Sequence, residues 1–384
     1  MTRRVVVLLV AVSAVAQLGA ARRACGQASF QVRPLFSAAE VYESNLWSTP
    51  SGAESDLIAR FTAGVESTWR SPLWRISGDY AADAERYARH STLTTPVARQ
   101  QAGLTMTTTP TARLTIAGRA DFLSTRDAQE LNGESGLTFT RARARRFSGQ
   151  TSLARELTPL TSGTLEYAFS ADSLGDVHHA SVHAAAARME HRLSPRTSVT
   201  GRYRVHRFAF GQPEVGSLVI SHALTVGVTR AIAPRLTLAL EAGPRATGGG
   251  LRPELSGSIV WAGTAAYGAL SYARTQATVI GLAGAADVEG LQASYARSLG
   301  RSLDVRVAPG LFRSALGGLH ADVYVLSLSI VRQVGRMLLV ELATEGTLQR
   351  GSLYATFAGQ TISRHRALLR LRAPLPAVGS ESGR

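Results

Sequence analysis

The chain has 384 residues, of which 45% are hydrophobic and 36 are glycine, and this composition excludes an intrinsically disordered protein. Its 42 basic residues are all arginine and give a formal net charge of +15. Because there is no lysine, the chain holds neither a Walker A lysine nor a lysine that could form a Schiff base. The arginines are scattered without interleaved aromatic residues, so we expect no nucleic-acid partner.

The N-terminus has the pattern of a secretory signal peptide. Two arginines precede the apolar run VVVLLVAVSAVA at residues 5–16, which is shorter than the roughly 20 apolar residues that a membrane-spanning helix needs. We predict cleavage after Ala28, so that residues 1–28 are removed; an N-terminal anchor that is retained is the alternative. Cleavage takes away Cys25, the single cysteine, together with four arginines and no acidic residue, and so leaves a net charge of +11.

Beyond the predicted signal peptide, the recurring pattern is an alternation of apolar and polar residues. In ARLTIAGRADF (112–122), Leu114 and Ile116 share one face, whereas Arg119 and Asp121 lie on the other. A period of two predicts β-strands with one apolar and one polar face. The alternating runs last about 10–14 residues, which suits tilted membrane strands and exceeds the roughly 5–6 residues usual in soluble sheets.

Short turn motifs recur along this region and set the strand count. Prolines or glycines mark seven of them, and we infer an eighth because one interval is about twice as long as the others. The predicted tight turns centre on Pro72, Pro110, Pro159, Pro195, Pro234, residues 263–266, Gly300 and Gly335. Longer connections are expected at 124–135, 171–179, 210–217 and 244–253. Eight tight turns join sixteen strands, and one further strand at each end, at about 30–42 and 353–373, makes eighteen.

These elements predict an all-β protein, namely a transmembrane antiparallel up-and-down β-barrel of about eighteen strands, with sixteen as the alternative count. Barrels of this kind have an even number of strands, short periplasmic turns and longer outer loops. We assign residues 29–373 to the barrel and residues 374–384 to a loose periplasmic tail. The predicted location is the cell outer membrane, so the lipid bilayer is the first partner. A soluble β-sandwich or solenoid is the alternative fold.

We find no sequence pattern for an active site. The chain contains neither an HExxH nor a GxSxG motif. HHASVH offers His178, His179 and His183, but no carboxylate or cysteine completes a tetrahedral metal site, so a solvated loop edge is the preferred interpretation. We therefore expect no catalytic residue, no metal and no cofactor, and we keep a barrel-type hydrolase as an alternative hypothesis.

The polar strand faces carry arginines that should point into the lumen. The candidate lumen-lining residues are Arg75, Arg113, Arg119, Arg202, Arg204 and Arg306. Acidic residues share these faces, namely Asp79, Asp121, Asp304 and Glu341. One interpretation is a ladder of ion pairs that holds the wall together, and the other is a basic pore surface that favours anions. The densest basic run, RARARR at 141–146, also alternates, and we place it on one face of a strand.

The segment 41–90 resembles the start of a group of Gram-negative outer-membrane barrels that are often encoded with exopolysaccharide or exosortase systems. The residues that carry the match are Tyr42, Asn45, Asp56, Gly64, Tyr80, Tyr87 and His90. The resemblance covers about fifty residues. It implies a barrel of roughly eighteen strands that serves as a conduit for polymer and works with a periplasmic polysaccharide-export protein.

The resulting functional hypothesis is an outer-membrane channel, without enzymatic activity, for export of an anionic exopolysaccharide. Lumen arginines would hold carboxylate or phosphate groups weakly and at many sites, so that the polymer can leave. A general diffusion porin for small anions is the first alternative, and it predicts a constricting loop that folds inward. A plugged structural barrel is a further alternative.

Overall fold

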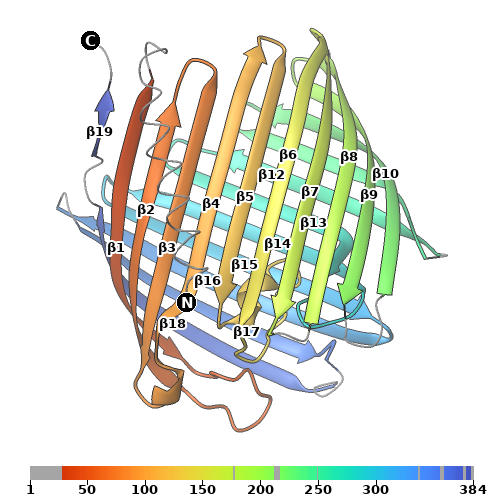
Figure 1. Ribbon diagram of the computed structural model, residues 1–384. Helices are drawn as coiled ribbons and strands as arrows, with labels where there is room; N and C mark the ends of the chain where they lie inside the picture. The colour runs from red at the N-terminus through yellow and green to blue at the C-terminus, as the bar shows by residue number, and fades with distance from the viewer. Residues whose placement is uncertain are drawn as a thin grey trace.

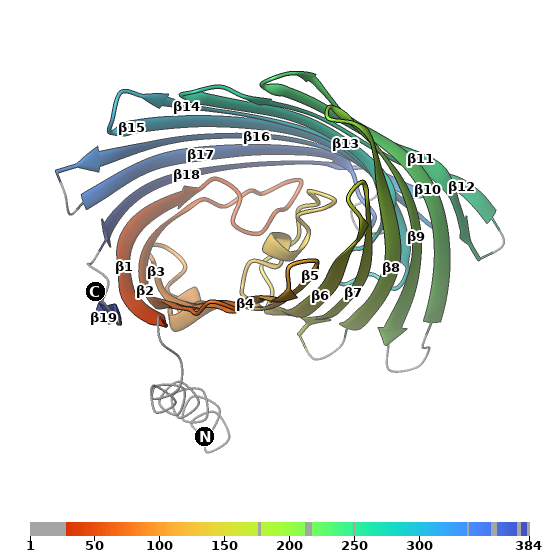
Figure 2. The ribbon, with the colours of Figure 1, turned by 90° about the horizontal axis from the view of Figure 1, so that it is seen from above.

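The computed structural model describes residues 28–175, 178–211, 217–248, 250–335, 338–354, 359–374 and 378–381, and their strands form a single antiparallel sheet. The first strand pairs both with the second and with the eighteenth, so the sheet closes into a barrel (Figures 1 and 2). Eighteen long strands follow one another around it in chain order, which confirms the predicted fold class and strand number. In this described part, no helix is long and apolar enough to cross a membrane. Residues 1–27 of the predicted signal peptide lie outside the described residues.

The strands are 12 to 17 residues long, apart from a short last one. They are β1 (Ser29–Glu43), β2 (Asp56–Arg70), β3 (Trp74–Tyr87), β4 (Thr95–Thr111), β5 (Leu114–Thr125), β6 (Ala144–Thr158), β7 (Thr161–Leu174), β8 (His178–Ser194), β9 (Thr197–Gly211), β10 (Ser217–Ala233), β11 (Leu236–Thr247), β12 (Gly250–Ala262), β13 (Ala266–Thr278), β14 (Ala285–Leu299), β15 (Leu303–Leu316), β16 (Leu319–Val334), β17 (Leu338–Gly351), β18 (Thr361–Pro374) and β19 (Val378–Glu381). Among the described residues, two short 3-10 helices lie in loops, η2 (Ser91–Leu93) and η3 (Ala128–Leu131).

The eight predicted tight turns join strands at one end of the barrel. The inferred turn near 263–266 is present between β12 and β13, and the turn expected at Pro110 lies two residues later, at 112–113, because β4 runs through the proline. The first described strand also begins at this turn end, since Ser29 pairs with Arg70 beside the first turn. The last described strand ends there too. In barrels of this type the short turns face the periplasm.

The expected long connections are partly wrong. The segments 171–179 and 244–253 are mostly strand, because β7 and β8 are separated by three residues and β11 and β12 by two. Several of their polar residues face the lumen rather than solvent around a loop; Arg245, for example, is buried and bonds Glu254. The connection expected at 124–135 instead covers 126–143, so that half of the run RARARR lies in a loop and half in β6.

The end of the chain differs from the expected loose tail. β18 starts at Thr361, eight residues later than predicted, and continues to Pro374. β19 then pairs with β1 from Ser29 to Val32, and so continues the ladder that β18 makes with β1. Part of the segment 374–384 is thus a strand of the sheet.

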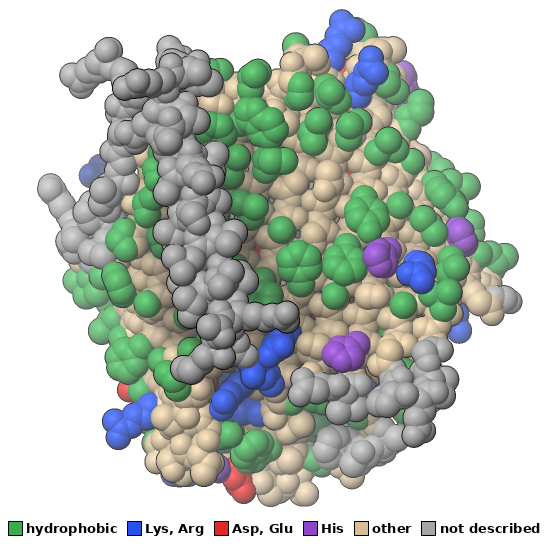
Figure 3. All heavy atoms as spheres, in the orientation of Figure 1, with side chains coloured by type: hydrophobic (Ala, Val, Ile, Leu, Met, Phe, Trp, Pro, Cys, Tyr) green, Lys and Arg blue, Asp and Glu red, His purple; other side chains and the backbone are tan. Residues whose placement is uncertain are grey.

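Side chains alternate between the two sides of the barrel wall, and those on the outside are largely apolar. Phe61, Leu165 and Val226 are 59%, 59% and 67% exposed, and Figure 3 shows such hydrophobic side chains spread over the outer face. A closed barrel leaves no unpaired strand edge, and an apolar outer surface suits lipid. The protein is therefore located in the outer membrane, as predicted.

Candidate functional site

The connection between β5 and β6, which we name the lumen loop (residues 126–143), folds into the barrel. Figure 2 looks along the barrel and shows this loop, with η3, inside the ring of strands. It makes hydrogen bonds to distant parts of the wall: Thr138 donates its backbone N–H and its hydroxyl to Gln349 of β17, and Asn132 accepts from the backbone N–H of Ile280. The loop therefore crosses the lumen near the end opposite the tight turns.

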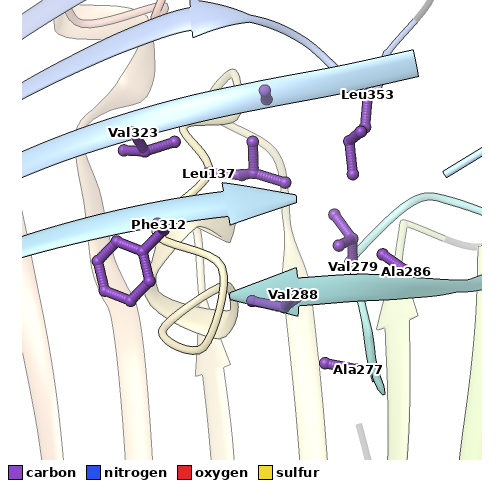
Figure 4. Packing of buried hydrophobic residues seen from close by; sticks show 9 residues of the cluster. Leu137, Ala277, Val279, Ala286, Val288, Phe312, Val323 and Leu353 are labelled. Carbon is purple, nitrogen blue, oxygen red and sulfur yellow. The ribbon is translucent and has the colours of Figure 1, made fainter. Parts of the chain in front are cut away.

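An apolar cluster anchors the middle of the lumen loop. Leu137 is fully buried among side chains of β13 to β16 and of Leu353, as Figure 4 shows from close by. The neighbouring Gly136 has a φ of 63°, and a Cβ there would lie 2.7 Å from the ring of Phe312, so only glycine fits this close approach. Burial of a leucine from water stabilises the seated loop by about 2 kcal/mol.

A buried charge cluster anchors the start of the lumen loop to β18 and β1. Asp127 accepts hydrogen bonds from Arg364 at 2.8 Å and from Arg366 at 2.9 Å, both on β18. Burial opposes ionisation of this carboxyl, but the charges of Arg364 and Arg366 outweigh it and hold the pKa of Asp127 well below its usual range. Glu43 of β1 bonds Arg364 as well, and it accepts a hydrogen bond from Arg141, at the far end of the loop, at 2.8 Å.

The same cluster continues into the wall formed by β2 and β3. Arg141 donates to the hydroxyl of Tyr87 at 2.8 Å, and Tyr87 in turn donates to Glu85 at 2.6 Å. Glu85 also pairs with Arg60, at 2.6 Å. Both ends of the lumen loop are thereby tied to four adjacent strands, so the loop is a fixed part of the lumen in this structure.

A second group of contacts clasps the outer rim, where β2 begins and β3 ends. The His90 ring bonds Asp56 through Nδ1 and Glu54 through Nε2, each at 2.7 Å. These hydrogen bonds raise the pKa of His90 above its ordinary value, the bond to Asp56 contributing most. Asp56 also accepts backbone N–H groups of the loop after β3, including that of Arg89. This rim clasp joins the two loops that follow β1 and β3.

The residues of the family-like motif fall into two groups. Asn45, Asp56, Tyr87 and His90 lie at the loop end, and Asn45 there bridges the backbone oxygens of Thr49 and Ser363. The others lie on the strands, where Tyr42 and Tyr80 are exposed on the outer face and Gly64 packs against the backbone of β3.

The predicted lumen arginines lie on the inner side of the wall, with one exception. Arg113 is in the turn before β5 rather than in a strand. Arg119 bonds Asp121 at 2.6 Å, and Arg202 and Arg204 lie 3.4 Å from Glu241 and 3.6 Å from Glu254. In the described part of the chain, neither Arg75 nor Arg306 has a carboxylate within 4.0 Å.

The unpaired arginines are at the turn end of the lumen. Arg306 lines a cavity of about 570 Å³ together with Glu341 and Arg372, close to the turns that follow β12 and β14. Arg75 is the second residue of β3 and so lies near the first tight turn. Glu43, Asp127 and Arg364 could not be predicted as a cluster, because no local pattern relates residues so far apart in the chain.

No protein-family model and no curated protein matches the chain. Among solved structures, the barrel is similar to OccK11 (OpdR) of Pseudomonas aeruginosa, with 13% sequence identity, a TM-score of 0.47, and coverage of 90% of this chain and 96% of that one. It is also similar to OccK2 (OpdF) of Pseudomonas aeruginosa, with 9% identity, a TM-score of 0.48, and coverage of 91% of this chain and 98% of that one. A third similar structure is the siderophore receptor PirA of Pseudomonas aeruginosa, with 8% identity, a TM-score of 0.46, and coverage of 91% of this chain and 81% of that one. These likenesses concern the β-barrel fold alone and carry no conclusion about what passes through the lumen.

Proposed function

We propose that this barrel is a diffusion channel for small anionic solutes, of the porin class. The observation that carries the proposal is the lumen loop, which is held across the barrel by Leu137 at its middle and by Asp127 and Arg141 at its two ends. A loop seated in this way narrows the passage, so that small solutes are admitted and wide polymers are excluded.

The preference for anions rests on the arginines that have no carboxylate within 4.0 Å among the described residues. Arg75 and Arg306 face the lumen at the turn end, and a guanidinium without a carboxylate at ion-pair distance attracts anions more strongly than one whose charge is matched by a carboxylate. The net charge of +11 expected after signal cleavage has the same sign.

Export of an anionic exopolysaccharide, with a periplasmic polysaccharide-export protein as partner, is the second candidate. It is favoured by the resemblance of segment 41–90 to barrels of exopolysaccharide loci, and by the position of four of its motif residues at the outer rim. This function requires the lumen loop to leave the barrel interior, which breaks both the buried ion pairs of Asp127 and the packing of Leu137.

The experiment that tests the proposal is single-channel recording of the refolded barrel in a planar bilayer, with ion selectivity from the reversal potential. We expect a small, anion-selective conductance that acidic polysaccharide does not block. A variant in which residues 128–141 are replaced by a short glycine-serine linker should conduct several-fold better. Cation preference, or no current from a folded barrel, overturns the proposal. Block by acidic polysaccharide on the turn side favours the export conduit instead.

A further inference from the structure

Charged side chains on the outer face mark the borders of the membrane-facing belt. On β16 the outward side chains between Asp322 and Arg332 are all apolar, and on β10 the same holds between His222 and Arg230. Both stretches have the roughly 9–11 residues of a tilted strand that crosses the hydrocarbon core. Asp322 and His222 therefore lie at the border nearest the loop end.

Along the part of this border formed by β13 to β17, the charges largely neutralise one another. Five outward residues on β13 to β17 are cross-strand neighbours in register, and they alternate in sign: Arg274, Glu289, Arg313, Asp322 and Arg350. Arg274 lies 3.0 Å from Glu289, and Arg313 lies 2.8 Å from Asp322. Most of the charge on β13 to β17 is therefore neutralised within the protein and needs no external counter-ion.

On the outer face of β8 to β10, the border carries basic and imidazole side chains without acids. Arg207 of β9 is exposed on the outer face, and its direct cross-strand neighbours are His183 of β8 and Ile220 of β10. His222 is its diagonal neighbour on β10. No acidic residue occupies an outward position of β8, β9 or β10. In the described residues, Arg207 has no carboxylate within 4.0 Å.

The histidines are held in place by tyrosines of the same face. The hydroxyl of Tyr167 bonds Nδ1 of His183 at 2.8 Å, and that of Tyr203 bonds Nδ1 of His222 at 2.8 Å. The two imidazole rings flank Arg207, and the second ring nitrogen of each remains available for a hydrogen bond to a ligand. Figure 3 shows histidine and arginine side chains set among hydrophobic ones over the face of β7 to β10.

We propose that Arg207, with His183 and His222, binds the phosphate of an anionic lipid in the leaflet at the loop end. A guanidinium facing lipid is costly without a counter-ion, and its planar fork binds phosphate oxygens in pairs. The apolar side chains on the membrane side of His222, such as Leu224 (57% exposed), contact the acyl chains. This combination fits an amphiphile, whereas a free phosphate ion leaves the apolar side chains uncovered.

The test uses the refolded barrel in a non-ionic detergent, titrated with diphosphoryl lipid A and followed by native mass spectrometry. R207Q should weaken lipid A binding by about tenfold, since a charge-assisted bond is lost. The matched control is R313Q on the opposite wall, where the arginine is already paired with Asp322. The lipid A affinity of R313Q should stay within about twofold of the wild type. Heat-modifiable gel mobility verifies that each variant is folded.

The wild-type protein gives a second readout that needs no variant. The same lipid without its phosphates should bind about tenfold more weakly than lipid A. Equal affinity for the two lipids overturns the proposal, as does wild-type lipid A affinity in folded R207Q. If the wild type forms dimers in the mass spectra, and R207Q loses them while its lipid A affinity is unchanged, the proposal is also overturned. That result assigns the surface to a second copy of the chain.

Discussion

Replacement of Asp127 by Asn tests whether the charge cluster holds the lumen loop in place. The substitution keeps the shape of the side chain and removes the negative charge that faces Arg364 and Arg366. The amide nitrogen can occupy the position of Oδ1, which has no hydrogen-bond partner among the described residues. The substitution therefore changes the charge of this side chain and leaves its volume nearly unchanged.

The expected magnitude follows from the contacts that remain. Removal of one partner from a buried ion pair costs about 3–5 kcal/mol. Glu43 still faces both arginines, and the Asn oxygen at the position of Oδ2 can still accept from both, so the loss should lie at the lower end, about 3 kcal/mol. Because about 1.4 kcal/mol is a factor of ten, the balance between the seated and the displaced loop shifts roughly 100-fold toward displacement.

Single-channel recording measures this shift directly. D127N should show openings to a higher conductance level, and liposomes that contain it should swell faster in a large neutral sugar. The control is D121N, which breaks the exposed pair with Arg119 on the wall outside the loop and should cost no more than about 1 kcal/mol. If D127N and D121N both conduct like the wild type, the charge cluster does not seat the loop and our reasoning is refuted.

Four further predictions concern the loop, the rim, the strand packing and the arginines. L137A should destabilise the seated loop by about 2–5 kcal/mol, seen as faster proteolysis within 126–143, and an unchanged rate contradicts the packing argument. His90 has a raised pKa, so the rim clasp is fully formed below about pH 6.5 and is lost as the pH rises through the raised value; cleavage of residues 44–55 should speed up over that range, and H90Q should remove the pH dependence. G64A places a Cβ 2.6 Å from the carbonyl oxygen of Tyr80 and should cost about 1–3 kcal/mol, measured as a lower temperature of the heat-modifiable gel shift. The double variant R75Q/R306Q should lower the anion-to-cation permeability ratio, and an unchanged reversal potential rules out these arginines as the selectivity residues.

The strands and turns were predictable because their signals are local. Alternation identified the inner and outer faces, and single prolines and glycines located seven of the turns. The turn between β12 and β13 followed from an interval about twice as long as the others. The same local signals failed at 171–179 and 244–253. Polar residues that bond across the lumen, such as Arg245 with Glu254, look in sequence like the polar residues of a loop.

The lumen loop was not predictable from local patterns. Asp127 and Arg364 are 237 residues apart in the chain, and Thr138 and Gln349 are 211 apart. Barrel closure brings β18 beside β1 and so places these residues within reach of a loop that starts at β5. The short run RARARR was assigned to a strand because its alternation continues into β6, while its first arginine in fact serves as the second charged anchor of the loop.

The two interpretations of the lumen arginines apply at different depths of the barrel. Arg202 and Arg204 each face a glutamate, so their charges belong to ion pairs of the wall. Arg75 and Arg306 lie toward the turn end without such partners in the described residues. A matched pair contributes little field beyond its own length, whereas unmatched charges add together in a narrow passage. Ion preference should therefore be set in the turn-end half of the lumen, and the size of the admitted solute by the loop above it.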